Sequence, residues 1–170
     1  ADLAGRLAAA GLERTQELVA RVLTAPPGGA APFDARPCAD FREFAAAQEL
    51  DWGVTGLDPA VRSSLRERLA GQWEREGRRG RTFVVLEAGE VVAVGRAHYG
   101  ESAVFLTGGA TAPHARGRGA YTSLVHARWT EAVTRGTAAL VTQASPDSDP
   151  ILARLGFESI GRVDLYRDRI

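Results

Sequence analysis

A glycine-rich turn that carries two arginines is the feature that most constrains the fold of this chain. The turn runs from Pro113 to Tyr121 and separates two different hydrophobic patterns. The residues from Val104 to Ala112 predict a strand, because an apolar, β-branched run is followed by small residues. After the turn, apolar side chains recur every three or four residues, which predicts a helix over residues 119–135. The turn therefore leads directly into a helix N-terminus.

This position suits a phosphate group. The first N–H groups of a helix lack intrahelical partners, and the helix dipole places positive potential there. Gly117 and Gly119 have no Cβ atom, so the backbone can approach a bulky anion. Arg116 and Arg118 add positive charge and forked donors. The turn thus predicts a phosphate site. A flexible solvated turn and an RNA-contacting loop are the alternatives.

The spacing within the turn narrows the kind of phosphate loop. A Walker A loop ends in Gly-Lys-Ser/Thr and this chain contains no lysine, while a dinucleotide fingerprint needs three spaced glycines. The segment from Arg116 to Tyr121 resembles the pyrophosphate loop of GNAT-type N-acetyltransferases, Gln/Arg-x-x-Gly-x-Gly/Ala. Arg116 takes the first place and Gly119 the fourth. Tyr121 departs from the pattern, because it stands where a Gly or Ala is usual.

The order of the predicted elements extends this resemblance over residues 81–170, and more loosely over residues 39–80. In order, the chain predicts strands at 82–86 and 91–94 joined by a hairpin, a strand at 104–106, the helix after the turn, a strand at 138–142, a helix at 150–155 and a strand at 163–166. The resemblance implies an α/β fold of the α+β type. Its mixed, mostly antiparallel central sheet would be flanked by helices and splayed between the strand before Arg116 and the strand at 138–143.

The N-terminal part of the chain is divided by composition. Two helices are expected at 41–50, capped by Asp40, and from Asp58 to Trp73. Residues 25–37 hold four prolines and two adjacent glycines, which predicts a loop. We therefore expect residues 39–170 to form the GNAT-like domain and residues 1–38 to be an extension with one helix and a strand at 18–23. Whether that extension belongs to a larger N-terminal unit stays open.

Charge and cysteine content exclude several classes of protein. The chain has 21 basic and 21 acidic residues, so it has no net field to attract nucleic acid or an anionic membrane. Cys38 is the single cysteine, which excludes an intramolecular disulfide and fits a reducing compartment. The three histidines are scattered, so no metal site is predicted. We expect a cytoplasmic protein without membrane or nucleic-acid partners.

The resemblance implies a site for acetyl-CoA as the acyl donor. Pantetheine would pair with the strand edge at residues 110–112, and pyrophosphate would bind the N–H groups from Gly117 to Tyr121. Gly108 and Gly109 predict a bulge just before the splay, with a plain turn as the alternative. The cofactor residues are then Ala110, Thr111, Ala112, Arg116, Gly117, Arg118, Gly119, Ala120, Tyr121 and Ser145.

No catalytic residue is assigned. Relatives often carry a glutamate near the strand before the loop, but residues 104–112 contain no carboxylate. Glu101, His98 and Tyr99 lie nearest in sequence. The tyrosine that protonates CoA in many relatives is replaced by Leu152, and the asparagine that precedes it is replaced by Ser145. Cys38 has no local helper, so direct transfer within a ternary complex is expected.

The acceptor is expected to bind at the loop between the first two helices. Glu49, Asp51 and Trp52 would suit a cationic amine through charge and cation–π attraction. The alternative is that Trp52 packs in the core and the two carboxylates stay solvated. The arginine-rich segment Arg75–Arg81 is interpreted as a solvated helix end, with a binding patch as the alternative.

The sequence thus favours an acetyl-CoA-dependent N-acyltransferase that acts on a primary amine of a small acceptor, and the resemblance leaves a homodimer open. The runner-up is a catalytically idle GNAT-like module that binds acetyl-CoA or CoA as a regulatory ligand. An RNA-contacting loop is a third hypothesis.

Overall fold

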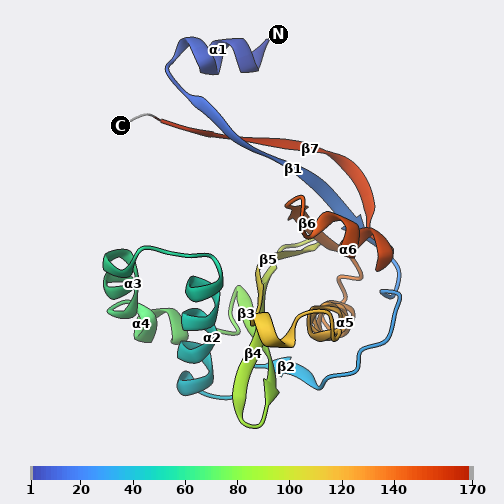
Figure 1. The fold of residues 1–170 in the computed structure, drawn as a ribbon. Helices are drawn as coiled ribbons and strands as arrows, with labels where there is room; N and C mark the ends of the chain where they lie inside the picture. Colours follow the sequence, from blue (N-terminus) through green and yellow to red (C-terminus); the bar gives the residue numbers. More distant parts are fainter. Residues whose placement is uncertain (1, 169–170) are drawn as a thin grey trace.

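One seven-stranded sheet organises the chain, and helices cover both of its faces (Figure 1). The computed structural model describes residues 2–168. The strand order is β2-β3-β4-β5-β6-β1-β7, and every neighbouring pair is antiparallel except the parallel pair β5–β6. The expected fold class is therefore confirmed. The elements are α1 (Leu3–Ala9), β1 (Glu13–Leu23), β2 (Ala35–Pro37), α2 (Phe41–Val54), α3 (Pro59–Arg66), α4 (Leu69–Trp73), β3 (Gly80–Glu87), β4 (Glu90–Tyr99), β5 (Val104–Thr111), a 3-10 turn (Pro113–Ala115), α5 (Ala120–Thr134), β6 (Leu140–Ala144), α6 (Asp149–Arg154) and β7 (Glu158–Arg167).

Local signals in the sequence set several of these boundaries. The Asp40 carboxylate accepts a hydrogen bond from the Glu43 N–H at the start of α2, and Asp58 caps α3 in the same way. Two-residue hairpin geometry joins β3 to β4 at Ala88 and Gly89, whose φ values are 51° and 84°. Two helices differ from the prediction: α2 continues to Val54, and the expected helix from residue 58 to residue 73 is broken into α3 and α4.

The sheet opens between β5 and β6. The two strands are paired from Val104–Leu140 to Leu106–Thr142, and beyond that point each continues without the other. One extra residue of β5 at Gly108 and Gly109 forms a bulge against β4, and Gly108 has a φ of 56°. The predicted bulge and splay are both confirmed. The edge of β5 beyond Leu106 is thereby left without a strand partner on the side of the splay.

The N-terminal segment contributes to the same sheet. β1 lies between β6 and β7 and is hydrogen bonded to both, starting five residues earlier than the expected strand at 18–23. β2 adds to the opposite edge through β3. The sheet therefore crosses the boundary placed at residue 38. Helix α1 and the outer parts of β1 and β7 project beyond the rest of the molecule (Figure 1).

Helices α2 and α5 pack on opposite faces of the sheet near the splay. Leu124 and Val125 of α5 are fully buried against β3, β4 and β5, while Phe44 and Ala47 of α2 are buried on the other face. In Figure 1 the two helices flank β3, β4 and β5. None of the helices in the described part of the chain has the length and apolar character that a membrane span needs.

Candidate functional site

A cleft of about 770 Å³ lies where the free edge of β5 faces the start of α5. The structure brings together there all of the predicted cofactor residues except Ala112 and Arg118. The cleft is lined by Val54, Gly109, Ala110, Thr111, Ala115, Arg116, Gly117, Gly119, Ala120, Tyr121, Thr122, Ser145, Asp147, Ser148, Ile151 and Arg154.

The turn before α5 leaves the first N–H groups of the helix available. Gly117 and Gly119 have φ values of 71° and 91°, in the left-handed region that glycine adopts without strain. No side chain of the described residues caps α5 at Gly119. Because uncapped N–H groups need an acceptor, this end of the helix is suited to an anion.

The two arginines of the turn have different surroundings. Arg116 lines the cleft, and its Nε donates a hydrogen bond to the Thr111 carbonyl at 3.2 Å. Arg118 instead forms a bidentate ion pair with Glu87, with Nη1 2.9 Å from Oε2, which holds the pKa of Glu87 below its usual range. Arg116 is thus the better placed of the two for a phosphate in the cleft. The predicted roles of Arg118 and of Ala112, whose N–H already donates to Val92, stay predictions.

A second cavity of about 350 Å³ lies within the splay itself and meets the cleft at four shared residues. Three of these carry hydroxyl groups: Tyr121, Ser145 and Ser148. The Tyr121 ring lies over Gly109, where a Cβ atom would be 2.8 Å from Cε2. The sequence placed Tyr121 in the phosphate loop only, whereas its side chain lies at the junction of the two cavities. We call this second space the splay cavity.

A buried arginine lines the splay cavity. Arg128 on α5 is 1% exposed, and its Nε donates to the Leu124 carbonyl at 2.9 Å. Its Nη1 donates to the Arg96 carbonyl at 3.3 Å, while Nη2 has no partner among the described residues. Burial without a counter-ion lowers the pKa of Arg128. Sequence analysis missed this group, although its spacing of four from Leu124 and Ala132 places it on the buried face of α5.

The structure separates His98, Tyr99 and Glu101, the three groups that lie nearest in sequence to the strand before the turn. His98 Nε2 lies 2.8 Å from the Thr107 hydroxyl, and Thr107 lines the splay cavity. Tyr99 donates to Glu131 at 3.0 Å, and burial raises its pKa to about 12. Glu101 is exposed in the turn after β4. No carboxylate of the described chain lines the splay cavity, and no cluster of residues within 2–168 is arranged to hold a metal ion.

The three expected acceptor residues lie on α2, so their expected position in a loop is wrong. Trp52 is 7% exposed and packs in a cluster with Phe44 and Leu69, which agrees with the alternative interpretation. Glu49 forms an ion pair with Arg66, and Asp51 accepts a hydrogen bond from Arg96 at 2.9 Å. Neither carboxylate lacks a partner. Their proposed role in acceptor binding stays a prediction.

The fold of this chain also occurs in solved structures. A GCN5-related N-acetyltransferase from Kribbella flavida superposes with a TM-score of 0.72 at 19% identity, over 99% of this chain and 64% of that one. The chain has the GNAT fold. Glucosamine-6-phosphate N-acetyltransferase from Arabidopsis thaliana gives a TM-score of 0.67 at 14% identity, over 81% of this chain and 99% of that one. A protein from Clostridium acetobutylicum described as a predicted acetyltransferase, solved with acetyl-CoA, gives a TM-score of 0.56 at 16% identity, over 75% of this chain and 91% of that one.

These likenesses concern the GNAT fold. This chain spans 64% of the length of the Kribbella protein. No protein-family model matches the sequence, and a search of curated proteins finds no match. An inference about function must therefore be drawn from the geometry of the cleft and the splay cavity.

Proposed function

We propose that this chain is an acetyl-CoA-dependent N-acetyltransferase that transfers an acetyl group to a primary amine of a small acceptor. One observation carries the proposal: the unpaired edge of β5 and the uncapped start of α5 line the same cleft. An acetyl-CoA molecule combines an extended chain of amides with a pyrophosphate. The amides can pair with the unpaired edge of β5, and the pyrophosphate can accept hydrogen bonds from the uncapped start of α5. The structure with acetyl-CoA among proteins of this fold supports the same donor.

The donor would bind as an additional strand. Backbone groups of Ala110 and Thr111 would pair with the pantetheine amides, because this edge has no strand partner. The pyrophosphate would accept hydrogen bonds from the N–H groups that follow Gly119, with Arg116 beside it. Pantetheine that runs inward from this point brings the thioester to Tyr121 and Ser145, at the junction with the splay cavity.

Transfer is direct in this scheme. The neutral amine attacks the thioester carbonyl carbon, a C–N bond forms and the C–S bond breaks. The Tyr121 hydroxyl would give a proton to the departing thiolate, and His98, hydrogen bonded to Thr107 of the splay-cavity lining, would accept the amine proton. Arg128 would supply positive charge for the oxygen that becomes negative in the transition state.

A calorimetric titration with acetyl-CoA tests the donor site. We expect micromolar binding that Arg116→Ala weakens about tenfold, the usual effect of losing one charged phosphate contact. Arg42→Ala is the matched control, since Arg42 is exposed on α2 outside the cleft. Release of CoA is then followed with a panel of primary amines. A folded protein that binds no acetyl-CoA would refute the proposal.

An idle module that binds acetyl-CoA as a regulatory ligand is the second candidate. The absence of a carboxylate from the described lining of the splay cavity favours it. The two functions differ in turnover. Tight binding with no CoA release above the spontaneous rate, for any amine of the panel, would favour the idle module.

A further inference from the structure

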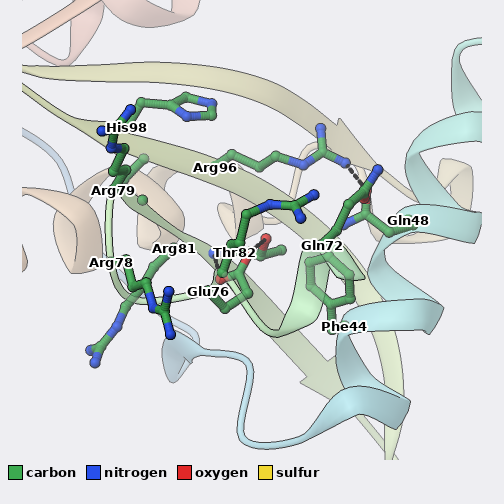
Figure 2. A pocket seen from close by; sticks show the side chains of 13 residues that line it. Phe44, Gln48, Gln72, Glu76, Arg78, Arg79, Arg81, Thr82, Arg96 and His98 are labelled. Atoms are coloured by element: carbon green, nitrogen blue, oxygen red, sulfur yellow. Dashed lines mark hydrogen bonds between the residues drawn. The ribbon is translucent and has the colours of Figure 1, made fainter. Parts of the chain in front are cut away.

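A third cavity of about 500 Å³ lies on the α2 face of the sheet, where α2, α4 and the turn into β3 meet β4 (Figure 2). It is lined by Phe44, Gln48, Gln72, Arg75, Glu76, Arg78, Arg79, Gly80, Arg81, Thr82, Arg96, Ala97 and His98. Five of these residues are arginines and one is a glutamate. We call this cavity the arginine pocket. The arginine-rich segment that was interpreted as a solvated helix end forms one of its walls.

Most of this positive charge is not neutralised within the protein. Arg96 is paired with Asp51 at 2.9 Å, and Arg81 lies 3.5 Å from Glu131. The other three arginines, Arg75, Arg78 and Arg79, form no ion pair with any described residue. Like charges that share a pocket repel one another, so an anion that enters lowers the electrostatic energy.

The one carboxylate of the lining is already engaged. Glu76 accepts hydrogen bonds from the Thr82 N–H at 2.8 Å and from the Thr82 hydroxyl at 2.9 Å. Figure 2 shows this pair in the middle of the pocket, with Arg78 and Arg81 on one side and Arg96 on the other. Glu76 therefore closes the turn into β3 and does not bridge the unpaired arginines in this structure.

The inner end of the pocket has an unsatisfied donor. Gln48 is 4% exposed, and its Oε1 accepts a hydrogen bond from Arg96 at 2.6 Å (Figure 2). Its Nε2 has no hydrogen-bond partner among the described residues. Buried N–H groups without an acceptor are rare because each costs free energy. Gln48 and Arg96 together thus present donors to an oxygen-rich ligand.

The arginine pocket adjoins the splay cavity. His98 lines the pocket, Thr107 lines the splay cavity, and the two side chains are 2.8 Å apart. The Arg96 guanidinium lies against Gly108 of the bulge, which also lines the splay cavity. The two cavities therefore lie next to each other, with these contacts between them.

We propose that the arginine pocket binds a carboxylate or phosphate group of the same small molecule whose amine is acetylated. This inference rests on the proposed function. Arginine is the side chain best suited to these groups, since its planar fork matches two oxygens at once. The acceptor is then an amine that carries a negative charge. A purely cationic acceptor is disfavoured, because the Glu49 and Asp51 carboxylates are already paired with arginines.

Binding of small anions tests the pocket without any need for turnover. Inorganic phosphate and succinate are titrated into the wild type and into the double variant Arg78→Gln/Arg79→Gln, with saturating CoA present so that phosphate does not enter the proposed pyrophosphate site. We expect both probes to bind the wild type and to lose at least about tenfold in affinity in the double variant, because two charged contacts are removed. Arg42→Gln is the matched control, since Arg42 is exposed on α2 outside the pocket.

The Arg116→Ala variant separates this inference from the proposed function. It is expected to weaken acetyl-CoA and to leave the affinity for succinate unchanged, whereas the double variant does the reverse. A wild-type protein that does not bind acetyl-CoA would refute the donor site alone. Equal affinity of phosphate and succinate for the wild type and the double variant would refute the arginine pocket alone.

Turnover of matched amines tests the link between the two sites. O-Phosphoethanolamine is compared with ethanolamine, and β-alanine with propylamine. In at least one pair, the member that carries the phosphate or carboxylate group is expected to have a kcat/KM at least about tenfold higher, and the double variant is expected to abolish that difference. The preferred pair tells phosphate from carboxylate. A preference for ethanolamine or propylamine, or a preference for the anionic group that survives in the double variant, would overturn the inference.

Discussion

The Arg128 guanidinium lies directly against Gly95, where α5 packs under β4. A Cβ atom at residue 95 would be 2.8 Å from Nη1 and 2.9 Å from Cζ of Arg128. Arg128 is 1% exposed, so its guanidinium has no solvent to move into. The glycine in β4 and the buried arginine of α5 therefore fit together as a pair.

The Gly95→Ala substitution is expected to destabilise the protein by about 1–3 kcal/mol, the usual cost of overpacking a core. The cost should be smaller when Arg128 is replaced by the flexible Met, because the clashing group is then absent. Urea unfolding of the two single variants and the double variant measures this coupling. Strictly additive effects would show that contact with Arg128 is not what makes a side chain at residue 95 unfavourable.

Tyr121→Phe is expected to lower kcat about tenfold or more and to leave the affinity for acetyl-CoA unchanged. The ring keeps its packing over Gly109, while the thiolate loses its nearby proton donor. Steady-state kinetics and calorimetry measure the two effects. Tyr166→Phe on β7, outside both cavities, is the control. An unchanged kcat would remove Tyr121 from the mechanism.

Gly119→Ala is expected to lower stability by about 1–2 kcal/mol and to weaken acetyl-CoA binding. The φ of 91° is strained for alanine, and a Cβ atom would be 2.8 Å from Pro32. Gly117→Ala is a matched comparison, since its φ is 71° but no atom lies within 4 Å of the added Cβ. Thermal unfolding should therefore show the larger loss at residue 119. The reverse order would mean that Pro32 does not pack on this turn.

Cys38 is expected to react slowly with iodoacetamide. Burial raises the pKa of its thiol to about 12, so very little of the reactive thiolate exists near neutral pH. Alkylation of the native protein at about pH 8 should be at least roughly a hundredfold slower than that of the urea-unfolded chain. Mass spectrometry follows the modification. Equal rates would contradict the burial of the thiol and reopen the question of a cysteine nucleophile.

Local patterns predicted the elements whose causes are local. The hairpin at Ala88, the bulge at Gly108 and the turn before α5 each depend on backbone conformations that glycine or a two-residue loop signals in the sequence. The resemblance added the mixed, mostly antiparallel sheet and the splay, which no short-range pattern contains. Eight of the ten predicted cofactor residues line the cleft for that reason.

Pairing over long distances accounts for what the sequence did not predict. β1 joins the sheet between β6 and β7, more than 100 residues away, so its mixed pattern gave little indication of its partners. Arg128 was overlooked because a charged residue on a buried helix face resembles a break in periodicity. The arginine pocket combines residues of α2, β3 and β4, and only tertiary structure shows that Arg79 and Arg96 share a cavity.

The ion pair between Arg36 on β2 and Glu43 on α2 makes stability depend on pH. The Glu43 carboxylate accepts two hydrogen bonds from Arg36, at 2.7 and 2.8 Å, and one from the Ala39 N–H. The Arg36 guanidinium holds the pKa of Glu43 at about 2, below the value of about 4.3 expected in the unfolded chain. A depressed pKa in the folded state adds stability that is complete above the unfolded value and is lost as the pH falls toward 2.

Glu43→Gln should therefore destabilise the protein by about 1 kcal/mol near neutral pH, a modest amount because Arg36 is partly exposed. Near pH 2 most of the difference from the wild type should be lost, because Glu43 is then about half protonated in the folded protein and almost fully protonated in the unfolded chain. Urea unfolding between about pH 7 and pH 2 measures both. Glu90→Gln, at an exposed position beside the hairpin, is the control. A difference that persists unchanged at low pH would mean that the amide disturbs packing, and that the ionised carboxylate of Glu43 adds no stability.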